Sequence, residues 1–182
     1  APMRAGEKSI YYSKYILGVI GNLDLSSGDV KEWAFPNQLA MTNSSTSIES
    51  LARSPDGSLW FAVTEYQGML GYFRPGGRNG LFTVYYHPVR GQAPMVYIRS
   101  LAFDKSGNCW FLGTGTGADS CVARLEVRTK KVVYWELPIN LMLNPTTVTV
   151  NSAGTSVWLS SIDANGGSTR DWIGHLDPSS GA

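Results

Sequence analysis

The sequence predicts an all-β repeat protein, and three observations support this class. The same hairpin phrase, an apolar run, a polar turn and a second apolar run with a tryptophan, occurs at Ile48–Ala62, Ile98–Leu112 and Thr146–Ser160. Its tryptophans, at positions 60, 110 and 158, are 50 and then 48 residues apart. Charged residues make up only 16% of the chain, against roughly 25% in an average soluble domain. A hairpin that recurs at near-constant spacing indicates a repeat architecture.

Each hairpin phrase carries turn residues at its centre. The turns are Pro55-Asp56-Gly57, Ser106-Gly107 and Ala153-Gly154. Glycine provides the backbone freedom that a tight β-hairpin needs, so these positions are predicted to join adjacent antiparallel strands.

A second phrase follows each hairpin and consists of a strand, a polar turn and an aromatic-rich strand. It occurs over residues 19–36, 69–88 and 121–138, and begins again over 172–181. The first three copies end at a proline, which cannot donate to a β-ladder and therefore marks a strand end. Four strands in about fifty residues are the signature of one blade of a β-propeller.

The chain, residues 1–182, is therefore predicted to form a single propeller arc, or half propeller, of about four blades. Residues 47–88 and 97–138 make complete four-stranded blades, while 9–36 lack the first strand and 145–181 lack the last. An arc exposes strand edges that a soluble protein must cover. We expect self-association through these edges into a homo-oligomer, with a four-bladed closure and a fragment of a larger propeller as alternatives.

Composition excludes two classes of partner. The formal charge of +1 provides no basic groove for nucleic acid, and no apolar run approaches the roughly 18 residues that a membrane span needs. Low charge with abundant Ser, Thr and Tyr favours an extracytoplasmic location over a cytoplasmic one. Cys109 and Cys121 are expected on consecutive strands, where two thiols and a cross-strand disulfide are both open.

Propeller topology places the longer, more varied connections on one face, where function tends to lie. The candidate ligand-binding residues on these connections are Tyr66, Arg90, Asp163, Arg170 and Asp171. His87 is a candidate general base, because imidazole titrates near neutral pH. Glu65, which lies with Tyr66 on a different connection, is a candidate acid. The tryptophans of the hairpin phrase recur where blades must pack, so all three are expected in the core.

The repeat phrases resemble those of the virginiamycin B lyase (streptogramin lyase) propellers of bacteria. The matching stretches are Ser54–Phe61, Ile173–Pro178 and Ile20–Pro36. A looser similarity exists to the propeller repeats of two-component sensors. The lyase resemblance implies a metal-assisted β-elimination that opens a cyclic peptide, with Mg²⁺ on carboxylates and a histidine base. It implies catalytic roles for Glu65 and His87, with Glu65 also as a metal ligand.

The family's acidic phrase is approximated once, at Trp60–Glu65, and the equivalent stretches of the other blades lack an acid. This favours an alternative function, a non-catalytic ligand- or protein-binding module that serves as sensor or scaffold. Its ligand would be a small molecule or a peptide.

Overall fold

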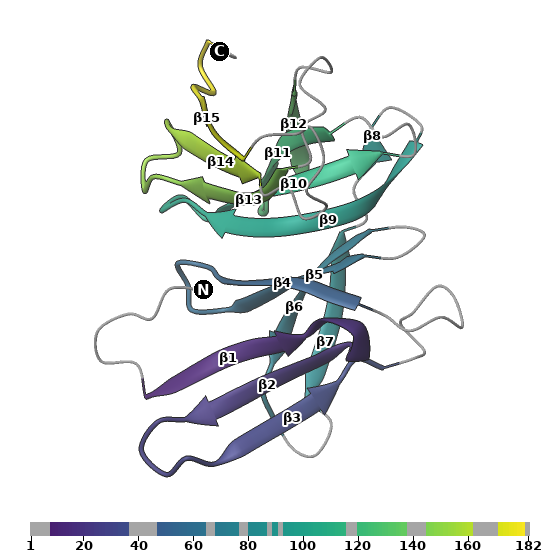
Figure 1. Ribbon diagram of the computed structural model, residues 1–182, viewed down its shortest axis with the longest axis vertical. Coiled ribbons are helices and arrows are strands. Elements are labelled where there is room, and N and C mark those ends of the chain that lie inside the picture. Colours follow the sequence, from purple (N-terminus) through teal and green to yellow (C-terminus); the bar gives the residue numbers. More distant parts are fainter. Residues whose placement is uncertain are drawn as a thin grey trace.

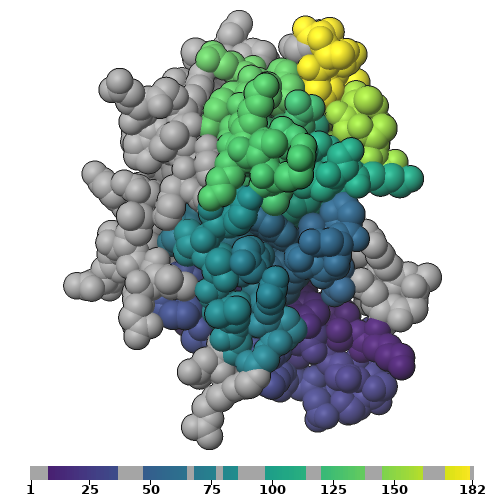
Figure 2. All heavy atoms as spheres, turned by 180° about the vertical axis from the view of Figure 1, so that it is seen from behind, coloured from purple at the N-terminus to yellow at the C-terminus, as the bar shows by residue number. Residues whose placement is uncertain are grey.

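The computed structural model describes residues 8–36, 47–64, 68–76, 80–86, 89–90, 93–115, 120–137, 145–161 and 171–180. These residues form four antiparallel sheets, and Figure 1 shows the first at the bottom, the second above it, and the third and fourth next to each other at the top. In Figure 2 the same order runs from purple to yellow on the opposite side. The sheets make an open arc of propeller blades, as predicted. No helix among the described residues is long and apolar enough to cross a membrane.

The first and last sheets have three strands each among the described residues. The first consists of β1 (Ser9–Lys14), β2 (Val19–Asp24) and β3 (Val30–Ala34), with the 3-10 turn Tyr15–Leu17 between β1 and β2. The last consists of β13 (Pro145–Val150), β14 (Val157–Ser161) and β15 (Trp172–Leu176). The strands in each sheet pair in sequence order.

The two middle sheets are larger. The second consists of β4 (Ser47–Arg53), β5 (Leu59–Thr64), β6 (Met69–Arg74) and β7 (Leu81–Tyr86). The third consists of β8 (Val89–Arg90), β9 (Ala93–Phe103), β10 (Asn108–Gly115), β11 (Ser120–Glu126) and β12 (Lys131–Glu136). The first strands of successive blades, β4, β9 and β13, pack side by side along the inside of the arc, and β1 lies against β4.

Each pair of neighbouring sheets encloses its own apolar cluster, because alternate residues of a strand point to opposite faces. Trp33, Phe61 and Phe73 are buried between the first and second sheets. Trp60 and Phe111 are buried between the second and third, and a third cluster around Trp110, Val148 and Leu159 joins the third sheet to the fourth.

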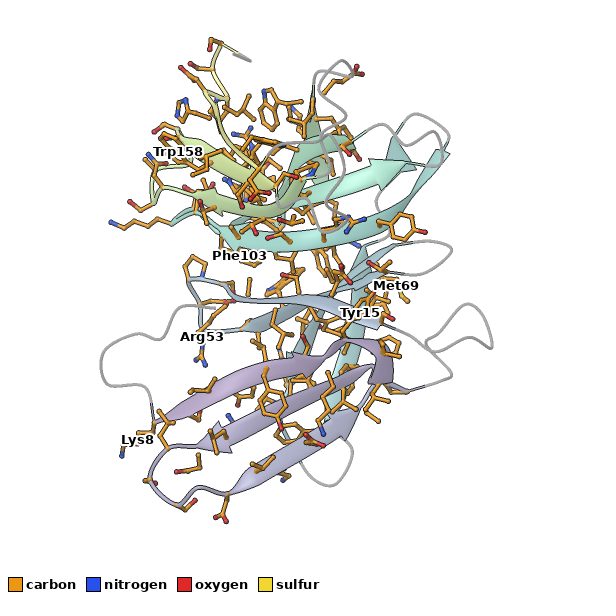
Figure 3. All side chains as sticks on the ribbon, viewed as in Figure 1. Lys8, Tyr15, Arg53, Met69, Phe103 and Trp158 are labelled. Atoms are coloured by element: carbon orange, nitrogen blue, oxygen red, sulfur yellow. The ribbon has the colours of Figure 1, made fainter. Side chains whose placement is uncertain are left out.

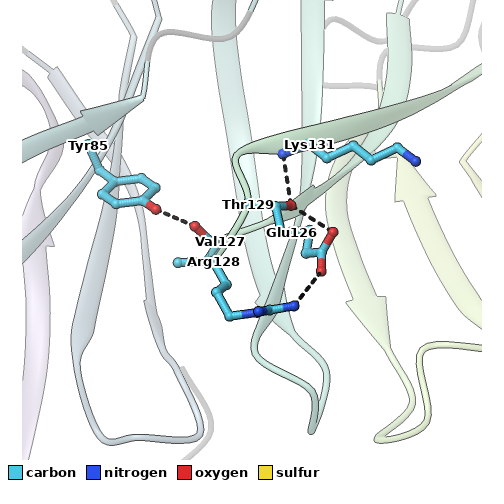
Figure 4. Close-up of polar contacts among 6 residues, drawn as sticks. All are labelled: Tyr85, Glu126, Val127, Arg128, Thr129 and Lys131. Atoms are coloured by element: carbon cyan, nitrogen blue, oxygen red, sulfur yellow. Dashed lines mark hydrogen bonds and ion pairs between the residues drawn. The ribbon is translucent and has the colours of Figure 1, made fainter.

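A polar contact reinforces the junction between the second and third blades. The Tyr85 hydroxyl on β7 donates a hydrogen bond to the main-chain carbonyl of Val127, in the turn between β11 and β12 (Figure 4). The same turn is held internally by the Thr129 hydroxyl, which donates to the Glu126 carboxylate at 2.7 Å. The Tyr85 ring also packs edge-on against Trp60, so the outer strand is fixed to the following blade.

The hairpin turns form at the predicted positions. Gly57, Gly107 and Gly154 have φ values of 86°, 80° and 71°, in the left-handed region that favours glycine.

Two expectations were wrong. Trp158 is 50% exposed, whereas Trp60 and Trp110 are buried, because no described blade covers the outer side of β14. Residues 89–90 and 93–96, which the predicted blades 47–88 and 97–138 leave between them, form β8 and the beginning of β9, which pair through Val89–Pro94 and Arg90–Ala93.

The two cysteines lie on adjacent strands, but they do not face each other. Cys109 is opposite Leu125, and Cys121 is opposite Gly113. Both are buried thiols, and burial raises the pKa of Cys109. The cross-strand disulfide is therefore not present.

Candidate ligand-binding groove

A groove of about 570 Å³ follows the inner side of the arc between β1, β4, β9 and β13. The inner strands present short side chains to it in a repeated pattern, Ser50-Leu51-Ala52, Ser100-Leu101-Ala102 and Thr147-Val148-Thr149. Such small residues let neighbouring strands approach closely and leave room along the axis.

Two of these hydroxyls connect successive blades. Ser50 Oγ accepts the main-chain N–H of Leu101 at 3.1 Å, and Ser100 Oγ accepts the N–H of Val148 at the same distance. In each case the hydroxyl binds the residue that follows its own counterpart in the next blade. The serines thus have a structural role, and ligand recognition must involve other residues.

All three inner strands contain an irregularity at the same repeat position. The pairing skips Glu49 between Ile48 and Ser50 on β4. It skips Arg99 on β9 and Thr146 on β13 in the same way. A β-bulge of this kind leaves one residue outside the regular alternation and redirects its side chain. The repeat therefore presents three non-identical side chains at one level of the inner strands, next to the groove-lining residues Ser50, Ser100 and Thr147.

Glu49 and Arg99 are the charged members of this level. Glu49 Oε2 and Arg99 Nε are both buried and have no hydrogen-bond partner. Burial raises the pKa of the Glu49 carboxyl, while the Arg99 guanidinium and the Tyr15 hydroxyl act to lower it. The Arg99 guanidinium also lies 5.8 Å from the centre of the Tyr97 ring. An unsatisfied acceptor and an unsatisfied donor thus lie on adjacent inner strands.

This charged level lies toward one end of the inner strands. Figure 3 shows Tyr15 near Met69 and away from Arg53 and Phe103, which mark the opposite ends of β4 and β9. At that opposite end the Arg53 guanidinium lies 5.7 Å from the centre of the Tyr11 ring. The inner strands therefore carry an acid–base pair toward one end and, at the other, a cation–aromatic pair whose two residues line the groove.

Of the seven site residues predicted from the sequence, two lie among the described residues, Arg90 and Asp171. Glu65, Tyr66, His87, Asp163 and Arg170 lie outside the described residues. Arg90 lies in β8, where its backbone pairs with Ala93, and Asp171 is exposed just before β15. Arg90 and Asp171 belong to different sheets. Within the described ranges no group of three or more His, Cys, Asp or Glu side chains could hold a metal ion.

Glu49 and Arg99 are not among the site residues predicted from the sequence, although the sequence contains a signal for them. The repeated phrase reads Ile-Glu-Ser-Leu-Ala at 48–52 and Ile-Arg-Ser-Leu-Ala at 98–102. Only the second residue differs, and it changes the sign of its charge. A variable charge inside an otherwise constant inner strand would have identified both residues.

Comparisons with known proteins establish the class of fold. No family model and no curated protein matches the chain. Among solved structures, it is similar to the extracellular domain of a one component system from B. thetaiotaomicron (14% identity, 93% of this chain and 21% of that chain, TM-score 0.55). It is also similar to TolB from Acinetobacter baumannii (15% identity, 96% and 39% covered, TM-score 0.58) and to the Dos1 propeller (14% identity, 84% and 39% covered, TM-score 0.54).

At these identities the likeness shows the fold alone. The chain is a β-propeller arc that spans between a fifth and two fifths of the length of these structures. Propeller blades carry many unrelated functions, so the function has to be inferred from the residues of the inner strands and the groove between them.

Proposed function

We propose that this chain is a non-catalytic recognition module, placed outside the cytoplasm, that binds a small molecule or peptide at the Glu49–Arg99 pair of the inner strands β4 and β9. The observation that carries the proposal is the pair of buried polar atoms, Glu49 Oε2 and Arg99 Nε, without partners. Leaving such groups unpaired costs free energy that a complementary ligand would recover. The likeness to a sensor's extracellular domain and the low charge of the chain support the proposed location.

The two groups define the chemistry of the ligand. The Arg99 guanidinium donates to a carboxylate or another acceptor, and the Glu49 carboxylate accepts from an ammonium, amide or hydroxyl group. Tyr97, which is 46% exposed, offers an aromatic surface beside the arginine. A ligand with a carboxylate and a nearby donor, such as an amino acid or a peptide terminus, satisfies both groups.

The test is a binding screen of free amino acids and dipeptides by thermal shift, followed by calorimetry on the hits. Arg99→Gln and Glu49→Gln are each expected to weaken a genuine hit by about tenfold to a hundredfold, the value of a charged hydrogen bond. Arg128→Gln and Glu126→Gln, whose side chains lie in the turn of Figure 4, are matched controls that leave affinity unchanged. If Arg99→Gln and Glu49→Gln both bind a hit as tightly as the wild type does, the ligand does not bind at this site.

The alternative to the proposed binding function is the lyase activity that the resemblance implies, and a separate assay tests it. The wild type is incubated with a cyclic depsipeptide of the streptogramin B class and Mg²⁺, and the products are separated by chromatography. Ring opening by β-elimination leaves the mass unchanged, whereas hydrolysis adds one water. Opening at constant mass that is lost in Glu65→Ala or His87→Ala would establish the enzyme and overturn the non-catalytic function.

A further inference from the structure

The inner edge of β1 differs from its counterparts in the other blades. In the other three sheets the strand equivalent to β1 (β5, β10 or β14) pairs on its inner side with β4, β9 or β13. The equivalence is fixed by register, because Gly21 is opposite Tyr12 just as Gly71 is opposite Phe61. Among the described strands, β1 is the inner edge of its sheet.

The backbone of β1 is oriented for another strand. The N–H of Leu25 donates to the carbonyl of Lys8 at 2.8 Å, which directs the polar groups of Lys8 toward the β2 side. Backbone groups alternate along an antiparallel strand, so those of Ser9, Tyr11 and Ser13 point the other way. The second blade shows the same orientation at Trp60, the counterpart of Tyr11. The Ser54 N–H donates to the Ser58 carbonyl, so the backbone groups of Ser58 point toward β4, and those of Trp60, two residues later, point the same way.

This edge faces the groove. Ser9, Ile10 and Tyr11 line the same space of about 570 Å³ as the β4 residues Ser50–Arg53. A row of backbone donors and acceptors beside a concave, largely apolar wall is the arrangement by which an extended peptide is added to a sheet.

The inner strands also indicate which side chains such a peptide carries. Two hydrogen bonds join the inner strands of neighbouring blades, and in both a serine hydroxyl accepts the N–H of the residue after its counterpart in the next blade: Ser50 from Leu101, and Ser100 from Val148. A strand paired with β1 would take the place of the inner strand of the first blade, next to β4. By the same pattern, a serine at the equivalent position of that strand would accept a hydrogen bond from the N–H of Leu51. The pattern shared by the inner strands is an apolar residue, a variable residue, Ser or Thr, Leu or Val, and Ala or Thr.

We propose that the β1 edge is a strand-addition site, which takes an extended segment of another polypeptide with this pattern as the fourth strand of the first blade. The site is separate from the Glu49–Arg99 pair, and the proposal does not depend on the proposed function.

The test uses a fluorescent peptide that copies Tyr97–Asp104 (YIRSLAFD) and its anisotropy on addition of the full chain. We expect saturable binding. Replacing the peptide serine by alanine is expected to weaken it about fivefold, the value of one neutral hydrogen bond. Two further peptides are N-methylated on alternate amides, one on the amides that would face β1 and the other on the remaining amides. If the peptide pairs through its backbone, only methylation of the amides that face β1 abolishes binding, whereas apolar adhesion would be affected equally by both.

The protein variant Tyr11→Pro removes one edge-facing N–H and is expected to lose the peptide while its far-UV circular dichroism stays unchanged. A folded Tyr11→Pro protein that binds like the wild type overturns the proposal, and so does equal binding of the two N-methylated peptides, which needs no protein variant. Self-association is the competing occupant. A dimer in mass photometry that millimolar peptide does not dissociate, together with absence of peptide binding, assigns the edge to a second copy instead.

Discussion

The two end faces of the arc come from the same repeat but differ in chemistry. On the outer face of the first blade, Tyr12 donates to Glu32 at 2.6 Å, and Lys14 forms an ion pair with the same carboxylate at 2.7 Å. On the outer face of the last blade, Trp158 and Ile173 are 50% and 77% exposed. One end is polar, while the other keeps the apolar character of an interior junction.

The repeat register locates this difference. Glu32 lies opposite Gly21, at the position filled by Val84 in the second blade and Tyr134 in the third. A charge therefore replaces an apolar residue only where no described blade precedes the sheet. At the other end the tryptophan of the repeat is retained although no described blade covers it, and the ring of His175 packs against it, with 4.7 Å between ring centres. The strand sequence thus specifies a blade, whereas the neighbouring blades determine whether each face of that blade is buried or exposed to solvent.

The largest expected effect separates an interior tryptophan from the terminal one. Trp110 is fully buried and stacks on Trp135, so Trp110→Ala is expected to lower the free energy of unfolding by about 3–5 kcal/mol. Trp158→Ala, at the same repeat position, is expected to cost less than about 1 kcal/mol. Urea unfolding of both variants measures the difference. Equal losses would mean that the last blade is covered in solution.

The hairpin turns provide the next comparison. Asp104 is 2% exposed, and it accepts hydrogen bonds from the Trp110 indole and from both nitrogens of Asn108. Asp104→Ala leaves the buried indole N–H unpaired and is expected to cost about 2–3 kcal/mol. Asn151, its counterpart in the last blade, is exposed and binds only its own turn. Asn151→Ala is expected to cost about 1 kcal/mol, and a similar loss from both variants by urea unfolding would contradict the comparison.

Two glycines sharpen the contrast in packing. A Cβ on Gly71 would lie 2.4 Å from both the Phe61 ring and the carbonyl oxygen of Thr83. Gly71→Ala is therefore expected to cost about 1–3 kcal/mol by overpacking. A Cβ on Gly21 would meet the Tyr12 ring, which lies on the outer face and can move into solvent. We expect the thermal midpoint of Gly21→Ala to fall less than that of Gly71→Ala, and the reverse order would show that the first face is covered.

The smallest effect is a pair of opposite pH dependences. Hydrogen bonds from Lys14 and Tyr12 lower the pKa of Glu32 below its ordinary 4.5, so its stabilisation is present above that pH and is lost as the pH falls through the lowered pKa. Burial raises the pKa of Glu49 above 4.5, so this carboxyl destabilises the fold as the pH rises through the raised pKa. Relative to wild type, Glu32→Gln is expected to be less stable at neutral pH, and Glu49→Gln more stable. Urea unfolding from pH 3 to 7 tests both signs, and the same sign for both variants would refute the assignment.

The comparison also shows how far the sequence could be interpreted. The strands and turns were predictable because alternation and glycine placement act within a few residues of each other. Gly57 and Gly107 take up the positive φ that their turn phrases require. Glu49 and Arg99 were missed because their role depends on a bulge that forms only when two strands pair.

By itself, the sequence determined the repeat, the antiparallel hairpins and the propeller class, because these depend on local pattern and recur in every blade. Only the tertiary structure decided which copies of a residue are buried. Trp110 and Trp158 have the same place in the phrase, but just one has a blade packed against it. Burial of a residue depends on the surface that packs against it as well as on the residue itself, and the local sequence pattern describes only the residue.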